Sequence, residues 1–382
     1  MDYFQKLKHH YKPAKGWVND PNGLVYFKGY YHIFYQHVPN YETPCDENNN
    51  YNPMCWGHAR TKDFITYEEL PVALAPDKEY DCDGCWSGTA IVKDGTLYVF
   101  YASISKKQEV QTVSVAYSDD GINFTKYEGN PIIDRFPDDG CRDFRDPAVC
   151  KIDGVYYCVM ASGKEAKARL LLYKSENLTD WSYAGIMLEQ DGTGTKIDGK
   201  RVIRSIYECP SIMEKDGKLL LLASVANFTE DETWHHSFSA NYGTFENGRF
   251  TCEYSAEMNK GPDQYAGQVF KDEKGRCILI SWIPGWKYQG YIEGKDVGCM
   301  SLPSEINIEN GKMTAYPVKE VRHLLKDSDD ALKMTEDGFI VEREGRDPLV
   351  YKGKFDDLKI LRDGYIMEIF LNGGSEIYTV LL

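Results

Sequence analysis

The chain has 382 residues, of which 42% are apolar, so it is long enough for one large β domain or for two domains. Its formal net charge of −15 disfavours nucleic acids and anionic membranes as partners. The aromatic content of 13%, with 28 Tyr and 7 Trp, favours β structure and surfaces on which sugars stack.

The first segment, MDYFQKLKHHYKP, lacks the uninterrupted apolar stretch of a signal peptide. No later stretch approaches the roughly 18 consecutive apolar residues of a membrane helix. We therefore expect a cytoplasmic protein that does not enter a membrane. The 11 cysteines are odd in number and scattered, which indicates reduced thiols. Cys82 and Cys85 form a C-x-x-C pair, but no second pair accompanies it, so we expect no metal site.

Short alternating runs bounded by Gly, Asp and Asn recur along the chain and predict β-hairpins. In chain order they are GLVYFKGYYHIFYQ, GTAIVKDGTLYVFYAS, VCKIDGVYYCVMAS, SIMEKDGKLLLLASV and KDEKGRCILISWI. Helical periodicity is scarce. The pattern predicts an all-β chain.

A second unit, in which a polar turn leads to an aromatic residue and a short apolar strand, begins near residues 58, 116 and 173. Its spacing is therefore close to 58 residues. A fixed period of that size is typical of a propeller blade, a four-stranded sheet that packs against its neighbours. Residues 14–320 hold about five such periods, which predicts a five-bladed β-propeller.

The pattern changes near residue 327, after which strand-like runs lack the blade signature. The polar run KDSDDA at 326–331 is a plausible linker. We therefore predict a propeller domain over residues 1–325 and a small β-sandwich module over residues 326–382.

This C-terminal module is too short for a full sandwich, and we expect about four strands in it. Four strands form one sheet but hardly two layers, which would leave apolar residues such as Ile366, Ile369 and Leu371 partly uncovered. Exposed sheet edges and apolar patches are commonly hidden by a two-fold interface. We therefore expect a homodimer that uses the truncated module.

Three acids, each one or two residues before a proline in a short turn next to an apolar strand, are candidates for catalysis. They are Asp20 in WVNDPNG, Asp146 in FRDPAV and Glu208 in YECPS. Taken singly, each fits a turn, a salt bridge or a surface position. Their blade spacing favours convergence, because the inner strands of a propeller all begin at one end of its channel. Intervals of 67, 59, 62 and 57 residues separate Asp20, Ser87, Asp146, Glu208 and Tyr265.

These blocks resemble, in the same order, those of glycoside hydrolase family 32, the invertase, sucrose-6-phosphate hydrolase and fructan hydrolase group. The resemblance extends from about residue 10 to 320. Supporting segments are FYQ at 34–36, WGHA at 56–59, WSGTA at 86–90, DQYAGQ at 263–268, SWIPGW at 281–286 and LPSE at 302–305.

The resemblance implies a retaining β-fructosidase in which Asp20 attacks the anomeric carbon and Glu208 protonates the leaving oxygen. A retaining enzyme needs two carboxyl groups about 5 Å apart, one ionised and one protonated. The resemblance makes Asp146 a transition-state stabiliser, and Arg145 would orient these carboxylates. Neither a metal nor another cofactor is implied.

The same resemblance assigns a fructosyl pocket. Its polar residues and Trp56 would contact the sugar, and three further tryptophans would form apolar walls. The contact residues are Asn19, Gln36, Trp56, Ser87 and Tyr265, and the walls are Trp17, Trp86 and Trp282. Aromatic residues in β sheets also belong to cores, so each tryptophan has a second interpretation.

Several alternatives stay open. The substrate is sucrose, sucrose-6-phosphate or a short fructo-oligosaccharide, and an exo-fructan hydrolase or a fructosyltransferase would carry the same three acids. A different class is a catalytically inactive propeller that binds sugars. No basic cluster reads as a phosphate clamp, although Lys164, Lys167 and Arg169 lie close together in the chain. The long segment 37–55 is expected to rim the pocket.

Overall fold

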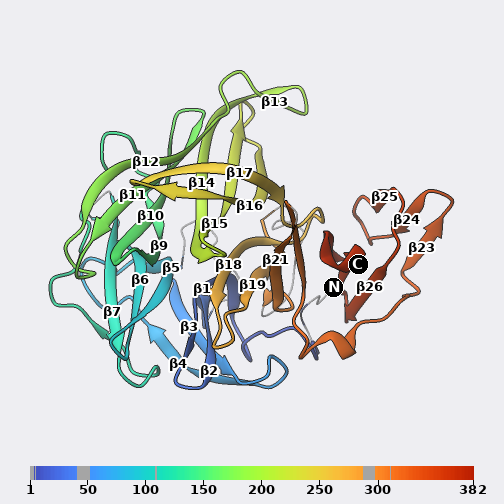
Figure 1. Cartoon of the computed structure of the whole chain (residues 1–382), viewed down its shortest axis with the longest axis horizontal. Helices are drawn as coiled ribbons and strands as arrows, with labels where there is room; N and C mark the ends of the chain where they lie inside the picture. Colours follow the sequence, from blue (N-terminus) through green and yellow to red (C-terminus); the bar gives the residue numbers. More distant parts are fainter. Residues whose placement is uncertain (1–3, 5, 41–51, 108–109, 287–296, 310) are drawn as a thin grey trace.

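The computed structural model describes residues 4, 6–40, 52–107, 110–286, 297–309 and 311–382. Within these residues, five antiparallel sheets of four or five strands are followed by two three-stranded sheets. Figure 1 shows the five sheets grouped around a centre, with the last strands, coloured orange to red, at one side. The predicted all-β fold, a five-bladed β-propeller followed by a small β-sandwich, is confirmed.

The first three blades contain four strands each, in sequential order. Blade 1 consists of β1 (Trp17–Phe27), β2 (Tyr30–Val38), β3 (Cys55–Thr61) and β4 (Tyr67–Leu74). Blade 2 consists of β5 (Gly84–Lys93), β6 (Thr96–Ile104), β7 (Gln111–Ser118) and β8 (Thr125–Lys126). Blade 3 consists of β9 (Arg145–Ile152), β10 (Val155–Lys164), β11 (Lys167–Ser175) and β12 (Ser182–Asp191).

The last two blades have five strands each. Blade 4 consists of β13 (Lys196–Ile197), β14 (Lys200–Lys215), β15 (Lys218–Thr229), β16 (Trp234–Glu246) and β17 (Arg249–Glu257). Blade 5 consists of β18 (Tyr265–Lys271), β19 (Cys277–Ile283), β20 (Cys299–Met300), β21 (Ser304–Glu309) and β22 (Lys312–Pro317).

The inner strands β1, β5, β9, β14 and β18 form a ring in which each contacts the next, and β18 contacts β1. The hairpins behind them turn on the predicted Asp-Gly pairs, such as Asp94-Gly95 and Asp153-Gly154. Both residues of each pair have positive φ, as a two-residue type I′ turn requires. The ring brings the starts of five strands, distant in sequence, to one end of the channel.

The C-terminal module has six strands in two sheets rather than the four strands we predicted. One sheet contains β23 (Leu332–Thr335), β24 (Gly338–Val341) and β25 (Leu349–Lys352). The other contains β26 (Leu358–Asp363), β27 (Ile366–Leu371) and β28 (Glu376–Leu381). Short 3-10 helices span η2 (Arg322–Leu324) and η3 (Asn372–Gly374).

Every residue of β27 is buried, which contradicts the expectation that its apolar side chains need a second chain. Ile369 and Leu371 pack in the core shared by the two small sheets. Ile366 and Phe370, on the other face, pack against propeller residues. The strand alternates between two partners of its own chain, so a homodimer stays a prediction without this support.

The N-terminal segment packs at the junction of propeller and module. Phe4 belongs to the same core cluster as Ile366 and Leu381, so the two ends of the chain lie together (Figure 1). All cysteines in the described part of the chain are free thiols, as expected. In that part, no helix has the length and apolar character needed to cross a membrane.

Candidate active site

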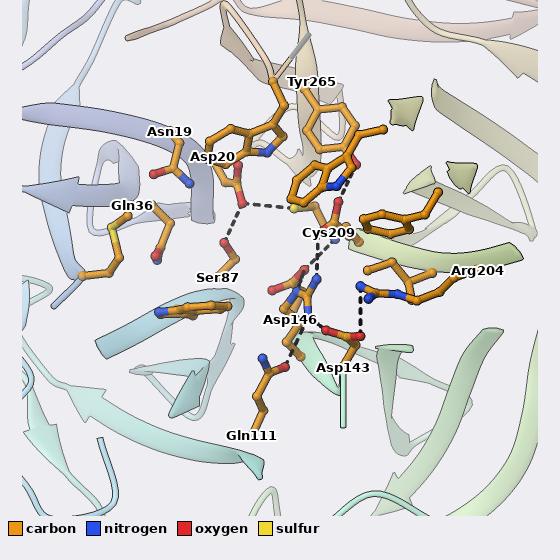
Figure 2. Close-up of a pocket in the computed structure, with 18 residues that line it drawn as sticks. Asn19, Asp20, Gln36, Ser87, Gln111, Asp143, Asp146, Arg204, Cys209 and Tyr265 are labelled. Atoms are coloured by element: carbon orange, nitrogen blue, oxygen red, sulfur yellow. Dashed lines mark hydrogen bonds and ion pairs between the residues drawn. The ribbon is translucent and has the colours of Figure 1, made fainter. Parts of the chain in front are cut away.

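A pocket of about 280 Å³ opens at the end of the ring where the inner strands begin (Figure 2). All five blades contribute to its lining. Nine of the twelve predicted site residues line it, and they are Asn19, Asp20, Gln36, Trp86, Ser87, Arg145, Asp146, Glu208 and Tyr265. The structure therefore brings together the three acids that blade spacing selected.

Asp20, on β1, is held through only one of its carboxylate oxygens. Ser87 Oγ donates to Asp20 Oδ2 at 2.7 Å, and the Cys209 thiol donates to the same oxygen at 3.1 Å. Oδ1 is buried and has no hydrogen-bond partner among the described residues. Burial raises the pKa of Asp20, and the hydrogen bonds from Ser87 and Cys209 offset only part of that effect.

Asp146, at the start of β9, accepts a hydrogen bond from the backbone N–H of Cys209 at 2.8 Å. The same oxygen lies 4.0 Å from Arg145 Nε. Burial raises the pKa of Asp146 to about 7, although the charge of Arg145 and the Cys209 N–H oppose the rise. Cys209 therefore links two of the acids, since its thiol contacts one and its backbone contacts the other.

Glu208, on β14, is held through both oxygens. Arg145 Nη2 lies 2.8 Å from Oε1, and Tyr265 Oη donates to Oε2 at 2.7 Å. Burial opposes the charge on Arg145, but the carboxylates around it outweigh burial and raise the pKa of its guanidinium. The ion pair fixes the Glu208 carboxylate at the wall of the pocket.

A β-bulge interrupts each of the five inner strands at the pocket, where two residues face one on the neighbouring strand. The bulged pairs are 19–20 on β1, 86–87 on β5, 146–147 on β9, 209–210 on β14 and 266–267 on β18. Bulges re-aim side chains and are frequent beside active sites. Each predicted acid thus lies in a bulge or directly before one.

Three bulge residues also adopt left-handed backbone conformations that side chains other than glycine rarely take. The φ angles are 58° at Asp146, 47° at Cys209 and 54° at Ala266. Such conformations cost on the order of 1–3 kcal/mol each and gather at functional sites. The propeller core around the ring must offset that cost.

Three predicted pocket residues, Trp17, Trp56 and Trp282, do not line the pocket but are buried behind it. Trp17 Nε1 donates to Asn19 Oδ1 at 2.7 Å, and Trp56 Nε1 donates to the carbonyl of Trp86 at 2.9 Å. Trp282 packs edge-on against Trp17, with ring centroids 5.9 Å apart. Their strand positions face the core, so they support residues that line the pocket.

Nine other lining residues were not predicted: Cys209 and Trp286 lie within the quoted blocks YECPS and SWIPGW but were given no role, and the rest lie outside the blocks. The nine are Met54, Gln111, Asp143, Arg204, Ile206, Cys209, Phe228, Trp234 and Trp286. Asp143 had a detectable signal, since it lies two residues before Arg145 and extended chains point such residues to one side. Trp234 and Phe228 had none.

Lys164, Lys167 and Arg169, which lie close together in the chain, do not line the pocket. Lys167 and Arg169 pair with Glu189, and Lys164 donates to a backbone carbonyl. Most of the segment 37–55, predicted to rim the pocket, lies outside the described residues. Among the described residues, no three His, Cys, Asp or Glu side chains are grouped to hold a metal ion.

Comparison with known proteins identifies the family. The family described as "Glycosyl hydrolases family 32 N-terminal domain" has a sequence model that matches residues 10–317 of this chain. Sucrose-6-phosphate hydrolase of Zymomonas mobilis is 34% identical over 334 residues, covering 82% of this chain and 62% of that protein. The Bacillus subtilis enzyme of the same name is 30% identical over 331 residues, covering 82% and 65%. The chain thus spans less than two thirds of these relatives' length.

The structural comparison agrees with the sequence comparison. A GH32 β-fructofuranosidase mutant of Bombyx mori, solved in complex with sucrose, superimposes with a TM-score of 0.78 at 26% identity. The superposition covers 100% of this chain and 89% of that one. Together with the family match over most of the propeller, these findings mean that the chain belongs to glycosyl hydrolase family 32.

Proposed function

We propose that the chain is a retaining β-fructofuranosidase that hydrolyses the fructosyl bond of a small sugar by double displacement. The observation that carries the proposal is the convergence of Asp20, Asp146 and Glu208, from three blades, in one pocket. Among them, Asp20 is anchored through Oδ2, which accepts hydrogen bonds from Ser87 and from Cys209. These bonds fix the carboxylate of the proposed nucleophile in the lining of the pocket.

In the first step the Asp20 carboxylate attacks the anomeric carbon of the fructosyl unit, and the bond from that carbon to the leaving oxygen breaks. Glu208 gives its proton to the leaving oxygen, which departs as a hydroxyl group. In the second step Glu208 takes a proton from water, whose oxygen attacks the same carbon and releases Asp20. Two inversions give net retention.

Asp146 and Cys209 support the nucleophile in this scheme. Asp146, fixed by the Cys209 N–H, would hold sugar hydroxyls in place while positive charge develops on the ring. Ser87 and Cys209 keep the Asp20 side chain from rotating, so that its carboxylate stays in place beside the sugar. Asn19 and Gln36, which also line the pocket, would bind further hydroxyls.

The substrate is proposed from chemistry and from the names of relatives. Two relatives are sucrose-6-phosphate hydrolases, and the Bombyx mori enzyme was solved with sucrose. We propose that sucrose, sucrose-6-phosphate or a short fructo-oligosaccharide is the substrate. Comparing kcat/KM for the three would rank them, and product analysis on sucrose versus a fructan would separate hydrolysis of a small sugar from fructosyl transfer and from exo-fructan hydrolysis.

The decisive experiment is a sucrose assay with NMR of the first product. Release of β-fructose as the initial anomer supports double displacement, and initial release of the α-anomer contradicts it. Sugar binding without turnover of any fructoside would favour the catalytically inactive propeller instead. A cytoplasmic location also stays a prediction.

A further inference from the structure

Asp143 is a fourth carboxylate in the pocket, and the scheme above gives it no task. It lies just before β9, with its side chain 20% exposed, between two arginines. Its Oδ1 lies 3.0 Å from Arg145 Nη1, and its Oδ2 lies 3.2 Å from Arg204 Nη2. Figure 2 shows Asp143 beside Arg204, joined by a dashed line. Both oxygens are occupied, so Asp143 is poorly placed to act on a substrate itself.

Arg145 is the guanidinium that Asp143 shares with the acids of the pocket. Nη2 of Arg145 lies 2.8 Å from Glu208, and its Nη1 pairs with Asp143. Its Nε lies 4.0 Å from Asp146. Gln111 Oε1 accepts a further bond from Nη1 at 3.4 Å. The side chain of Arg145 is only 12% exposed, so water screens the charge of Arg145 weakly. One positive charge therefore faces three carboxylates.

The charge on Asp143 changes what Arg145 can do to Glu208. A nearby cation stabilises a carboxylate and opposes its protonation, and a nearby anion has the opposite effect. Glu208 must carry a proton to serve as the acid, yet it is paired with a cation. Other charged or titratable groups near Glu208 come from several elements. They are Asp20 on β1, Asp146 on β9, Arg204 and Cys209 on β14, His236 on β16 and Tyr265 on β18.

We propose that Asp143 is a positioning residue that, by sharing Arg145, lets Glu208 hold the proton the first step requires. The inference rests on the proposed function of Glu208 as the acid. Asp143 holds Arg145 in place and also neutralises part of its charge. Arg204 has the opposite effect, because it pairs with the same Asp143 carboxylate and leaves less of its negative charge to neutralise Arg145. The Arg204 side chain is 43% exposed, and its guanidinium carbon lies 4.0 Å from the centre of the Phe228 ring.

The test is the pH dependence of kcat/KM for sucrose in Asp143→Asn. Asparagine keeps an oxygen that accepts from Arg145 but removes the negative charge. We expect the basic limb of the profile, which reports loss of the acid's proton, to move down by about one pH unit. Asp143→Glu, which keeps the charge, should leave the limb close to its wild-type position. The exposed pair Asp134 and Arg135 offers a matched control, since Asp134→Asn should not move the limb.

Arg204→Gln supplies the opposite test, because Asp143 would then neutralise Arg145 more fully and the limb should move up. Because neighbouring carboxyl groups titrate together, the position of the basic limb belongs to the group of carboxyls and not to one residue. The test therefore depends on the opposite directions of the two shifts and not on the size of either shift. A limb unmoved in both variants, or moved in one direction by both, would overturn the proposal. If Asp143→Asn fails to fold, Arg204→Gln decides alone. A wild-type protein inactive on every fructoside would instead refute the proposed function.

Discussion

Two of the buried groups of carboxylates among the described residues differ in the hydrogen-bond donors that the chain gives them. One is the catalytic pocket. The other lies at the junction of propeller and module, where His10 Nδ1 is 3.0 Å from Asp363 and its Nε2 is 2.8 Å from Glu368. The two clusters differ in the hydrogen-bond donors and in the charges that face their carboxylates.

At the junction, Asp363 is paired within the chain through both of its oxygens. Asp363 accepts hydrogen bonds from the backbone N–H groups of Lys8, His9 and His10, and Glu368 accepts one from Leu302. Burial would raise the pKa of Asp363, but the bonds and charge of His10 and these N–H groups outweigh it and lower the pKa. A complete partner set stabilises the ionised form.

In the pocket, the effect of burial on the carboxyl pKa values outweighs that of the hydrogen bonds. The pKa of Asp20 and of Asp146 is raised, because each has few donors for its degree of burial. Incomplete pairing costs stability and leaves groups able to form new bonds. Mutations in the two clusters should therefore affect different quantities, catalysis in one and stability in the other.

The largest effect is expected from Asp20→Ala, because the fructosyl-enzyme cannot form without the nucleophile. We expect kcat to fall by roughly 10⁴- to 10⁶-fold while the midpoint of thermal unfolding stays within a few degrees or rises. Initial rates and a thermal melt measure both. A variant within tenfold of wild-type activity would sink the assignment.

Glu208→Ala should cost less, and its cost should depend on the leaving group. General acid catalysis contributes about 10²- to 10⁴-fold, most for a poor leaving group such as glucose. A nitrophenyl fructoside needs little protonation and should be partly spared. The ratio of the losses on sucrose and on the nitrophenyl compound is the measurement, and equal losses would contradict the role as acid.

At the junction, His10→Ala should reduce stability without changing kcat. Removing one member of a buried ion pair leaves uncompensated carboxylates and costs about 3–5 kcal/mol. Denaturant unfolding of the variant and wild type gives this difference. A fall in kcat comparable to that of Glu208→Ala, with unchanged stability, would erase the contrast between the two clusters.

The same junction predicts a pH dependence of stability. Burial alone would lower the pKa of His10, but Asp363 and Glu368 raise it from 6.5 to about 9. The folded state therefore holds a proton that the unfolded state releases near pH 6.5, so this contribution is present below pH 6.5 and is lost as pH rises through about 9. The loss is about 3 kcal/mol. In His10→Gln, the free energy of unfolding should differ less between pH 6 and pH 10 than it does in the wild type. A pH difference as large as that of the wild type would contradict this account.

The sequence was sufficient for the ring of blades and its acids, because a repeated pattern carries both. Asp20 and Asp146 directly precede prolines, Glu208 lies two residues before one, and the three acids follow the blade spacing, while Asp-Gly turns mark the hairpins. The bulges that aim these side chains were not readable, since a bulge depends on pairing with another strand.

The orientation of the tryptophans and the packing of the C-terminal module could not be predicted from the sequence. Periodicity does not say whether Trp56 or Trp282 faces the core or the pocket, and both face the core. Trp234 forms part of the pocket although it follows no block, because the end of the β15–β16 hairpin brings it there. For β27, alternation predicted one buried face, whereas tertiary packing buries both.

The smallest effects should come from the two donors to Asp20 Oδ2, which sharpen the claim that this acid is only lightly held. Ser87 Oγ donates at 2.7 Å, and a hydrogen bond of a hydroxyl to a carboxylate contributes about 1.5–3 kcal/mol. Ser87→Ala should therefore lower kcat by roughly 10- to 100-fold. The Cys209 thiol is a weak donor, so Cys209→Ala should cost about fivefold or less. Its backbone N–H, which holds Asp146, is retained in the variant. Steady-state kinetics of the two variants and of Cys209→Ser, which offers a stronger donor, rank the three. If Cys209→Ala lost more activity than Ser87→Ala, the thiol rather than the hydroxyl would be the main support of the nucleophile.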